Sequence, residues 1–392
     1  MLDKSPSPAY TKHVLIGINI LLVVIGMTER EAEIFRILQQ HPSISQSELA
    51  ARLNIARSSV AVHIANLQKK GYILGKGYIL NSDSYVLGVG AANVDIHGRS
   101  KKAFVMHDSN PGYMSSSAGG VTRNVCENLA RLGAPVKLIS AVGTDVYADQ
   151  IRRECRAAGI DISHLYTVEG AHSSTYMSLL DENGDMFVAL SDMHVLQRLP
   201  LSYLSGKQSL IRGARIVTCD PSLPEATILH LLDLCGEDVP VYVDPVSTAY
   251  ARVLAPHIGR FDTAKPNVLE LEILSGRRIT DAASLEDAGR AVLDKGLRRL
   301  FVSLGKDGCL YMDREGTVLR RKLRPLEKMQ NATGAGDAFM AAVIYSTLNG
   351  FSTERTLDYG LAAGIAAISH EKTINPDMSA ALVESIIKEY AL

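Results

Sequence analysis

The sequence predicts a layered α/β protein that follows a small helical module, on three observations. From Tyr85 onward, short apolar runs alternate with amphipathic stretches, a pattern typical of a mainly parallel sheet with helices on both faces. Before that point, residues 27–80 carry closely spaced helix-start signals. The 392 residues are enough for two or three domains, and the 31 glycines suit a fold with many tight turns.

The composition excludes several classes of protein. The 41 basic and 42 acidic residues leave a net charge of -1, and 46% of the residues are hydrophobic, which argues against global disorder and against a uniformly basic polynucleotide binder. The cysteines are odd in number, far apart and never in a C-x-x-C pair, so they indicate neither a disulfide framework nor a zinc site. We therefore expect a reducing, cytoplasmic location. The five cysteines are Cys126, Cys155, Cys219, Cys235 and Cys309.

Residues 1–26 form a separate extension with an apolar run from Val14 to Ile25. About 20 apolar residues are needed to span a bilayer, so this run is too short for a transmembrane helix. It ends at Gly26-Met27 without a small-x-small cleavage site. Two interpretations stay open: translation starts at Met27 and the segment is a start-site artefact, or the segment is a signal or membrane anchor. We expect the first, and no membrane partner.

Residues 27–80 have the pattern of a winged helix-turn-helix domain. Thr28-x-x-Glu31 and Ser45-x-x-Glu48 are capping boxes that open two short helices, and a longer third helix follows over about residues 56–70. The segment 71–80 then supplies two short β-prone runs around a central Gly-Lys-Gly, which suits a hairpin wing.

This domain is a candidate for binding duplex DNA. It carries seven basic and four acidic residues, a net charge of +3, whereas residues 81–392 carry 32 basic and 37 acidic residues, a net charge of -5. We expect the third helix to enter a major groove and nearby lysines to meet phosphates. The alternative is a docking or dimerisation module that does not bind DNA. The candidate base-reading residues are Arg57, Ser58, Ser59, His63 and Asn66, and the candidate phosphate contacts are Lys69, Lys70 and Lys76.

The α/β part is expected over residues 85–392. Two stretches, 93–118 and 173–191, interrupt the alternation of strands and helices, and the second contains an Asn183-Gly184 turn. We predict that both form antiparallel strands that stand off the main sheet as a lid. Strands are expected at 86–90, 136–142, 215–219, 239–244 and 300–304, and helices near 121–132, 146–158, 224–235, 284–295, 336–349 and 379–389.

The strongest chemical signal is Asn331-Ala-Thr-Gly-Ala-Gly-Asp337 at the start of a helical run. Its glycines allow the backbone amides of Gly334, Ala335 and Gly336 to converge on an anion, and a helix N-terminus adds about half a positive charge. Phosphoryl transfer needs such a place, together with a carboxylate that accepts the proton of the attacking hydroxyl. Asp337 stands where that base belongs. Alternatively, Asp337 is a first-turn residue that only complements the helix dipole.

This string resembles the C-terminal signature of the PfkB (ribokinase-like) carbohydrate kinase family. Ser117-Ala-Gly-Gly-Val-Thr-Arg-Asn124 resembles the N-terminal signature of that family, and three further motifs follow the family's order over about 300 residues. The resemblance implies a ribokinase-like fold, mainly a parallel sheet with helices on both faces and a small β lid, with ATP as co-substrate and Mg²⁺. The three further motifs are Gly90-Ala-Ala-Asn-Val-Asp95, Asn267-Val-Leu-Glu270 and Ser303-Leu-Gly-Lys-Asp-Gly308.

The resemblance also implies a role for each matching position. Asp337 is the base, and Glu270 holds Mg²⁺ through water, because Mg²⁺ usually keeps several waters. Gly119-Gly120 allows close backbone approach and a hinge for the lid. Taken alone, Asp95, Asn124 and Glu270 are also compatible with turn, helix-cap and surface roles. The implied substrate-binding residues are Asn93, Asp95, Gly119, Gly120, Asn124 and Asp220, and the implied ATP-binding residues are Asn267, Ser303, Gly305, Gly308 and Thr333.

Within the family, five details resemble pseudouridine kinases. They are Ser109-Asn-Pro-Gly112, Gly-Gly-Val-x-Arg-Asn, Val243-Asp-Pro-Val-Ser247, Lys265-Pro-Asn267 and the loop before Asp337 that starts with Asn331. This likeness implies transfer of the ATP γ-phosphoryl group to the 5'-hydroxyl of pseudouridine. The alternatives are a kinase of inosine-like nucleosides or free sugars, and a ligand-sensing transcriptional regulator with a non-catalytic kinase fold. A homodimer formed through the lid is also expected.

Two further cofactor questions arise from the sequence. The family often has Asp where this chain has Asn331, near a loop that can hold a monovalent cation, so a potassium site stays open. Gly88-Val-Gly-Ala-Ala-Asn93 mimics the start of a dinucleotide fingerprint, but the third glycine is replaced and strand-like residues follow. The sequence contains no G-x-x-x-x-G-K-[ST] motif, so ATP is not held by a P-loop.

Overall fold

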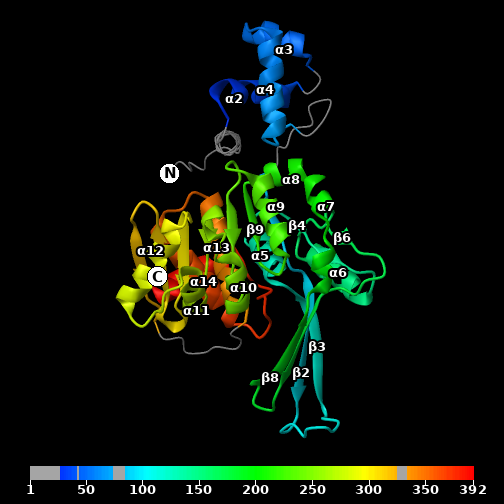
Figure 1. Cartoon of the computed structure of the whole chain (residues 1–392), viewed down its shortest axis with the longest axis vertical. Helices are drawn as coiled ribbons and strands as arrows, with labels where there is room; N and C mark the ends of the chain where they lie inside the picture. The colour runs from blue at the N-terminus through cyan, green and yellow to red at the C-terminus, as the bar shows by residue number, and fades with distance from the viewer. Residues whose placement is uncertain (1–26, 42–43, 74–83, 325–332) are drawn as a thin grey trace, which may run out of the picture. The chain divides into compact units, whose positions relative to one another are not determined.

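The computed structural model describes residues 27–41, 44–73, 84–324 and 333–392. Three features expected from the sequence lie outside the described residues: the extension 1–26, most of the wing with Lys76, and Asn331. The chain divides into two units, one made of residues 1–84 with 207–213 and the other of residues 85–206 with 214–392 (Figure 1).

The first unit contains α2 (Glu29–Gln40), α3 (Gln46–Leu53) and α4 (Arg57–Lys69), which confirms the three predicted helices. Both capping boxes form. The side chains of Thr28 and Ser45 each accept a hydrogen bond from the backbone N–H three residues on, and their own backbone N–H groups donate to the carboxylates of Glu31 and Glu48. The helices enclose a hydrophobic core of their own. Its buried side chains include Ile34, Phe35, Leu38, Leu49, Leu53, Val60, Ile64, Leu67 and Ile73.

The second unit is built on an eight-stranded sheet in the order β14-β13-β12-β11-β10-β9-β1-β4. The strands from β12 to β4 are parallel and only β13 and β14 run antiparallel, which confirms the predicted mainly parallel sheet. Every residue of β1 and β9 is buried, as expected of central strands covered on both faces. The strands are β1 (Val86–Val89), β4 (Val136–Ile139), β9 (Ile216–Cys219), β10 (Val241–Val243), β11 (Thr263–Ala264), β12 (Arg299–Ser303), β13 (Cys309–Asp313) and β14 (Val318–Arg321).

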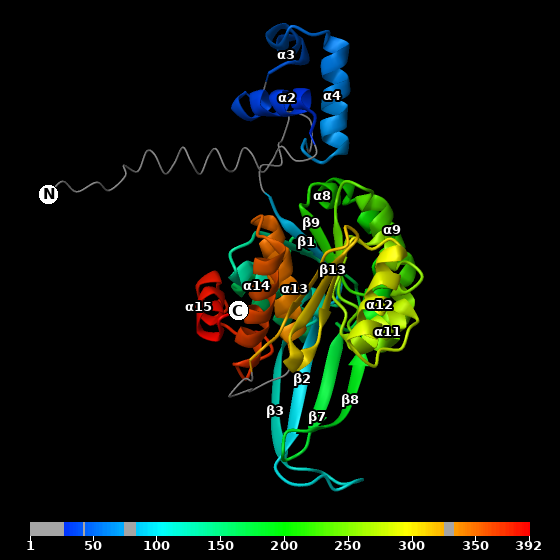
Figure 2. The same cartoon turned by 90° about the vertical axis from the view of Figure 1, so that its left-hand side faces the viewer.

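Helices cover both faces of this sheet (Figure 2). On one side lie α13 (Ala335–Leu348), α14 (Thr353–Ile368) and α15 (Ala380–Tyr390), and on the other lie α9 (Glu225–Cys235), α11 (Val268–Ser275) and α12 (Ala282–Asp294). In the described part of the chain, no helix is long and apolar enough to cross a membrane. The other helices are α5 (Val121–Arg131), α6 (Val146–Ala157), α7 (Leu201–Ser205), α8 (Gln208–Arg212) and α10 (Thr248–Leu254), with 3-10 turns at η1 (His194–Arg198), η2 (Ile258–Arg260) and η3 (Gly305–Asp307).

A second sheet of four strands extends away from the main sheet (Figures 1 and 2). Its order is β3-β2-β7-β8, and its strands are β2 (Asn93–Ser100), β3 (Gly112–Gly119), β7 (Thr175–Leu180) and β8 (Met186–Asp192). The β2–β3 and β7–β8 pairs are antiparallel, but β2 and β7 pair in parallel, so the prediction of antiparallel strands is wrong at that junction. The reason is that β2 and β7 are the first strands of two separate hairpins. A small third sheet pairs β5 (Ala141–Val142) with β6 (Tyr166–Thr167).

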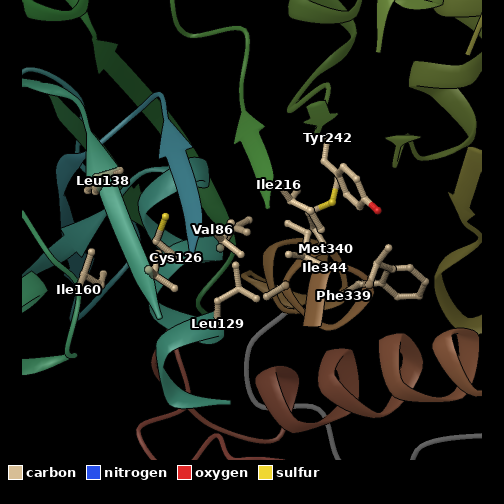
Figure 3. Close-up of a cluster of buried hydrophobic side chains, with 14 of the residues drawn as sticks. Val86, Cys126, Leu129, Leu138, Ile160, Ile216, Tyr242, Phe339, Met340 and Ile344 are labelled. Atoms are coloured by element: carbon tan, nitrogen blue, oxygen red, sulfur yellow. The ribbon is translucent and has the colours of Figure 1, made fainter. Parts of the chain in front are cut away.

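The main hydrophobic core lies between the sheet and the helices α5 and α13 (Figure 3). Strand residues Val86, Leu138 and Ile216 meet Leu129 of α5 and Met340 of α13 in this cluster. Because α5 and α13 pack on the same core, their N-terminal turns are held near each other at one edge of the sheet.

Sequence periodicity did not identify α14, the longest helix in the described part of the chain. Its two glycines, Gly360 and Gly364, weaken helix propensity and obscure the apolar stripe. In the structure, α14 packs along α13, and a Cβ atom on Gly360 would lie 2.8 Å from ring atoms of Phe339. The sequence could not reveal this close approach, because it depends on a partner helix.

The two glycines of α14 predict opposite effects of substitution by alanine. Gly360→Ala should destabilise the protein by about 1 kcal/mol, because overpacking against the Phe339 ring outweighs the gain in helix propensity. Gly364→Ala should stabilise it by a similar amount, since its nearest neighbour, Ala335 O, is 3.7 Å from the new Cβ. Thermal and urea unfolding of both variants tests this, and equal effects would contradict the packing described here.

Candidate active site

The candidate site lies where neighbouring parallel strands of the main sheet end. Gly90 follows β1, Asp220 follows β9, Asp244 follows β10, Lys265 follows β11, and Ser303 ends β12. The carboxyl ends of parallel strands share one edge of a sheet, where ligands of open α/β folds bind. The first turns of α5 and α13 close this edge.

The first turn of α13 is built to face an anion. Gly334 precedes the helix with a φ of +87°, and a Cβ atom there would lie 2.1 Å from Thr373 O, so only glycine fits. No side chain of the described residues caps this turn, so the amides of Ala335 and Gly336 stay available to a ligand. The exposed Thr333 lies directly before it. This geometry suits the predicted role of the glycine-rich turn.

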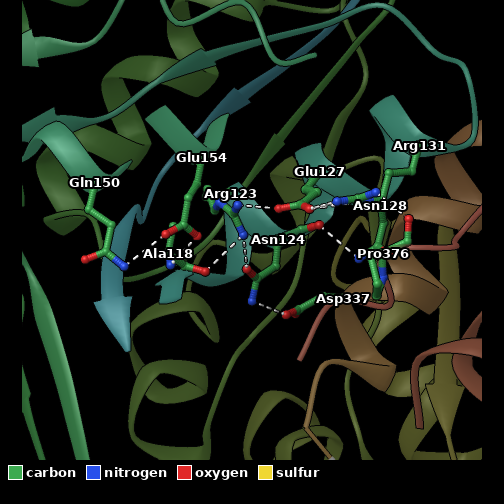
Figure 4. Close-up of polar contacts among 10 residues, drawn as sticks. All are labelled: Ala118, Arg123, Asn124, Glu127, Asn128, Arg131, Gln150, Glu154, Asp337 and Pro376. Atoms are coloured by element: carbon green, nitrogen blue, oxygen red, sulfur yellow. Dashed lines mark hydrogen bonds and ion pairs between the residues drawn. The ribbon is translucent and has the colours of Figure 1, made fainter. Parts of the chain in front are cut away.

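Asp337, in the same turn, is buried, with 9% of its surface exposed. Asn124, in the first turn of α5, donates a hydrogen bond of 2.9 Å from Nδ2 to Asp337 Oδ2 (Figure 4). The pKa of Asp337 is raised to about 7, mainly by burial and then by the charge of Asp244, against the hydrogen bond from Asn124 and the charge of Lys265. A carboxyl group with a pKa near neutrality is suited to general-base catalysis.

The structure adds a buried ion pair to which sequence analysis gave no role. Lys265 Nζ lies 3.0 Å from Asp244 Oδ2, and both side chains are buried. The same Nζ lies 3.2 Å from where a Cβ would stand on Gly336, so the ammonium group packs against the first turn of α13. Burial lowers the pKa of Lys265, but the nearby carboxylates of Asp244, Glu270 and Asp337 together outweigh it and the net shift is upward. No strand was predicted before Lys265, so sequence analysis could not place this residue beside Asp244.

Asp244 is held by a strained turn. Val246 has a φ of +66°, which a β-branched residue rarely adopts. Its backbone N–H donates a 2.9 Å hydrogen bond to Asp244 Oδ1, while the other carboxylate oxygen faces Lys265. The strained turn therefore orients the carboxylate, and backbone strain of this kind is concentrated at functional sites.

The predicted substrate-binding residues gather where the lid joins the main sheet. Asn93 donates from Nδ2 to Asp95 Oδ1 at 2.7 Å, and burial raises the pKa of Asp95. A Cβ on Gly119 would lie 2.2 Å from Asp95 Oδ2, and Gly120 has a φ of +100°. The two glycines are thus required by close approach and by a left-handed backbone. With Asn124, these residues supply amide donors and carboxylate acceptors that suit a diol.

Asp220 differs from the expectation for a sugar-binding residue. Its Oδ2 accepts hydrogen bonds from Ala91 N and from both N and Oγ1 of Thr122, and its Oδ1 accepts one from Ser222 N. It is fully buried. Its hydrogen-bonding capacity is used within the protein, so the carboxylate is better suited to holding the start of α5 against β1 than to binding a sugar.

The predicted Mg²⁺ ligand lies in a capping box. Asn267 Oδ1 accepts from Glu270 N, and Glu270 Oε2 accepts from Asn267 N, both at 2.9 Å. Glu270 is buried, and burial raises its pKa. The described residues contain no group of three or more metal-ligating side chains. The carboxylates nearby are hard oxygen donors that fit Mg²⁺ arriving with nucleotide phosphates and water, because Mg²⁺ needs few protein ligands.

The predicted nucleotide-side loop lies next to this capping box. Ser303 pairs with Asn267 across a parallel bridge and donates its N–H to Pro266 O at 3.0 Å. Gly305 and Gly308 have φ values of +59° and +94°, and a Cβ on Gly308 would lie 1.9 Å from Arg321 O. The structure therefore brings the ATP-binding candidates Asn267 and Ser303 together, with the glycines shaping the loop between them and β13.

The predicted DNA-reading residues of α4 do not share one face. Arg57 and Ser58 are exposed, with Asn66, whereas Ser59 and His63 are partly buried. Lys70, predicted to meet phosphate, donates to the buried Glu31 at 2.9 Å, so part of its charge is balanced within the unit. Sequence reasoning missed Val62, which lies one turn beyond Ser58 and is 59% exposed. Helical spacing measured from buried Val60 and Ile64 could have identified this outer face.

The chain matches two family profiles. Residues 83–380 match that of the pfkB family carbohydrate kinase, and residues 27–73 match that of winged helix-turn-helix DNA-binding domains. The first match spans well over half of the chain and includes every candidate site residue outside the helical unit.

Similar proteins of known sequence are kinases of sugars and nucleosides. The chain is 36% identical to "Uncharacterized sugar kinase YeiI" of Escherichia coli (strain K12), over 90% of this chain and 97% of that protein. It is 34% identical to pseudouridine kinase of the same organism, over 79% of this chain and 98% of that protein. It is 26% identical to guanosine-inosine kinase of Exiguobacterium acetylicum, over 75% and 98%.

Solved structures share the fold of the second unit. A carbohydrate kinase from Agrobacterium tumefaciens is 26% identical with a TM-score of 0.67, and the match covers 78% of this chain and 97% of that one. A ribokinase from Arabidopsis thaliana complexed with ribose and ATP has a TM-score of 0.69 at 20% identity, over 79% and 99%. These matches confirm the ribokinase-like fold.

The raised pKa of Asp337 predicts a pH-dependent cost to stability. Its folded-state pKa of about 7 lies above the ordinary value of 3.8, so the folded state binds more protons between these pH values and stability falls as the pH rises through them. Asp337→Asn removes this cost. Relative to the wild type, its unfolding temperature should rise between pH 5 and pH 8 by roughly 1 to 3 °C. The control is Asp287→Asn, at an exposed position of α12, and the same change in both variants would contradict the assignment.

Proposed function

Because the chain belongs to the pfkB family of carbohydrate kinases, phosphotransferases with an alcohol group as acceptor, we propose that it phosphorylates the 5'-hydroxyl of pseudouridine with ATP. The observation that carries this proposal is the buried Asp337 beside an uncapped, glycine-led helix N-terminus. A base and an anion site in one turn are the two parts that phosphoryl transfer to a hydroxyl requires.

In this proposal each part of the site has a chemical task. Asp337 accepts the proton of the attacking hydroxyl, and the amides of the first turn of α13 stabilise the charge on the transferring group. Lys265, held by Asp244 against that turn, adds positive charge beside the same group. An ammonium group placed in a buried site interacts strongly with developing negative charge, because solvent screening is weak there.

ATP and Mg²⁺ are assigned to the neighbouring side of the site. Asn267 and Ser303 would line the nucleotide phosphates, and Glu270 would hold Mg²⁺ through water. When bound, Mg²⁺ supplies charge neutralisation on the phosphates. A ribokinase II structure from Escherichia coli contains both ATP and Mg²⁺. At 20% identity, its similarity to this chain is one of fold, and it supports the assignment of ATP and Mg²⁺ to this side of the site to that extent.

The choice of pseudouridine rests on sequence likeness. The 34% identity to pseudouridine kinase extends over 98% of that protein, and the polar side chains of Asn93, Asp95 and Asn124 suit the ribosyl diol of any nucleoside. Guanosine-inosine kinase at 26% identity supports an inosine-like nucleoside as the alternative. A regulator that only binds its ligand has no need of a buried base, so the intact Asp337 favours an enzyme.

The kinase proposal predicts the outcome of a substrate panel. ADP release should give pseudouridine a higher kcat/KM than uridine, inosine or ribose. Asp337→Asn should lower kcat by about 10²- to 10⁴-fold, the usual contribution of a positioned base. Since the base acts when deprotonated, kcat/KM should fall as the pH drops below about 7.

Each contrary result has a defined meaning. A higher kcat/KM with inosine would move the assignment to the alternative nucleoside. Turnover by Asp337→Asn close to that of the wild type, with Asp287→Asn as the matched control, would remove Asp337 from the base role. Absence of turnover with every nucleoside and pentose would favour a non-catalytic regulator.

For the helical unit, we propose binding to duplex DNA. The match to winged helix-turn-helix DNA-binding domains supports it, as does the character of α4. This helix begins at Arg57 with no acidic residue in its first turn, and no side chain among the described residues caps it. A positive charge at a helix N-terminus is unfavourable within the protein but suited to phosphate or guanine. Exposed Val62 suits a thymine methyl group.

A homodimer through the lid would give this binding useful affinity. Strand β8 is exposed along its whole length, and the apolar residues exposed on the lid sheet include Tyr113, Met114, Phe187, Val188 and Leu190. Exposed apolar surface of this kind often marks a protein interface. Two copies would present two α4 helices to two half-sites. The five buried, free cysteines are compatible with a reducing, cytoplasmic location.

The DNA proposal predicts a difference between two arginine variants. In a titration with the gene's own upstream DNA, Arg57→Ala should weaken binding about tenfold, because it removes a contact of α4. Arg36→Ala removes the same charge from the exposed surface of α2 and should have a smaller effect. Binding of the wild type at low salt that is no better than that of Arg57→Ala would make the unit a docking module. Nucleoside should change the affinity if the two units are coupled.

A further inference from the structure

The buried guanidinium of Arg123 lies between the lid and the proposed base, and the proposed function gives it no task (Figure 4). Arg123 is in the first turn of α5, one residue before Asn124. Burying a guanidinium is unfavourable unless it is paired and hydrogen-bonded. The use of this residue at such a position therefore requires a specific explanation.

The contacts of Arg123 fix the orientation of the Asn124 amide. Its Nη1 donates to Asn124 Oδ1 at 3.2 Å, and the Nδ2 of the same amide donates to Asp337 Oδ2 at 2.9 Å. If the amide rotated by 180°, its oxygen would face the carboxylate of Asp337 and would no longer accept a hydrogen bond from Arg123. Arg123 therefore ensures that Asn124 presents its NH₂ group to the base.

The same nitrogen also holds the end of the lid strand β3. Arg123 Nη1 donates to Ala118 O at 3.0 Å. The backbone N–H of Ala118 in turn donates to Glu154 Oε2 of α6 at 2.9 Å. The main chain of β3 is thus fixed by side chains of α5 and α6 directly before Gly119-Gly120, the predicted hinge (Figure 4).

The charge of Arg123 is balanced locally. Its Nη2 forms an ion pair with the buried Glu127 one turn later on α5. Arg131 donates to the other carboxylate oxygen of Glu127 and also to Pro376 O. Arg123 and Glu127 can therefore be removed together without changing the net charge of the site, and Arg131 can be removed without touching Asn124.

We propose that Arg123 is a positioning residue that couples the end of lid strand β3 to the orientation of the Asn124 amide at the base. The inference rests on the proposed function for its catalytic consequence, but its geometric part does not. A residue that only stabilised the fold would leave the proton affinity of Asp337 unchanged when removed.

The groups that face Asp337 make this distinction measurable. They are Asp220 after β9, Asp244 after β10, Lys265 after β11 and Asn124 on α5. Replacing the neutral pair Arg123 and Glu127 leaves the three charged groups in place. Among the groups that face Asp337, it affects only the Asn124 amide, which loses its constraint and whose hydrogen bond lowers the pKa of Asp337.

The first experiment follows the carboxyl carbon of Asp337 by NMR in ligand-free, ¹³C-aspartate-labelled protein. The signal is assigned by its absence in Asp337→Asn. In Arg123→Met/Glu127→Gln, the pKa of Asp337 should rise by about half a unit or more, because the charged form loses a donor. Arg131→Met should leave it within about 0.2 units of the wild type, as expected of a group in the same network without contact to Asn124.

If the double variant does not fold, Arg123→Lys replaces it. Lysine keeps a positive charge for Glu127 but lacks the planar fork of arginine, so it cannot hold the amide oxygen and the hinge carbonyl in the same geometry. Arg123→Lys should therefore also raise the pKa of Asp337. An Asp337 pKa that does not change in the folded double variant or in Arg123→Lys would overturn the proposal.

A kinetic measurement then tests the catalytic consequence. Both Arg123 variants should lose at least about tenfold in kcat with a smaller change in KM, and the acid limb of kcat/KM should move to higher pH. Arg131→Met should retain wild-type values. If the wild type phosphorylates no nucleoside or sugar, the proposed function fails, and the carboxyl titration still decides the role of Arg123.

Discussion

The hydrogen bond from Asn124 to Asp337 joins residues 213 positions apart and sets the geometry of the site. Asp337 is buried, and a buried carboxyl group without a partner is strongly unfavourable. The bond forms only if α5 and α13 begin at the same edge of the sheet. Their packing on a common core with β1 provides this, so the hydrophobic cluster and the polar site depend on each other.

The balance of charge around this bond explains the proton affinities of the site. Asp244, Glu270 and Asp337 interact with one buried cation, Lys265, so negative charge is in excess. Burial and this excess both raise the pKa of Asp337 and Glu270. A Mg²⁺ ion bound beside these carboxylates would reduce the excess and favour the deprotonated form of Asp337, whereas the phosphates of a nucleotide would add to it.

Much of the fold was predictable because its signals are local. Strand runs, capping boxes and the glycine-led turn before Asp337 depend on neighbours within a few residues, and the structure confirms these elements. The features that escaped prediction depend on distant partners. Gly360 allows α14 to approach Phe339, and β2 pairs in parallel with β7 because two hairpins meet.

The same distinction between local signals and distant partners applies to the candidate site. The motif around Asp337 and the diglycine before α5 could be recognised in the sequence. The ion pair of Lys265 and Asp244, and the use of Asp220 as an internal anchor, could not, because each depends on which strands are adjacent in the sheet. Order along the chain does not give order within a sheet.

An ion pair within the helical unit also reduces the positive charge that this unit presents to solvent. Lys70 pairs with the buried Glu31, so part of its charge stabilises the unit. Arg57 and Lys69 remain exposed on α4. Each phosphate contact contributes to affinity through counterion release, so under the DNA proposal a single unit would bind weakly. If the unit binds DNA as proposed, specific binding would depend on presenting two copies of α4 at once, and dimerisation would then be required for a regulatory role.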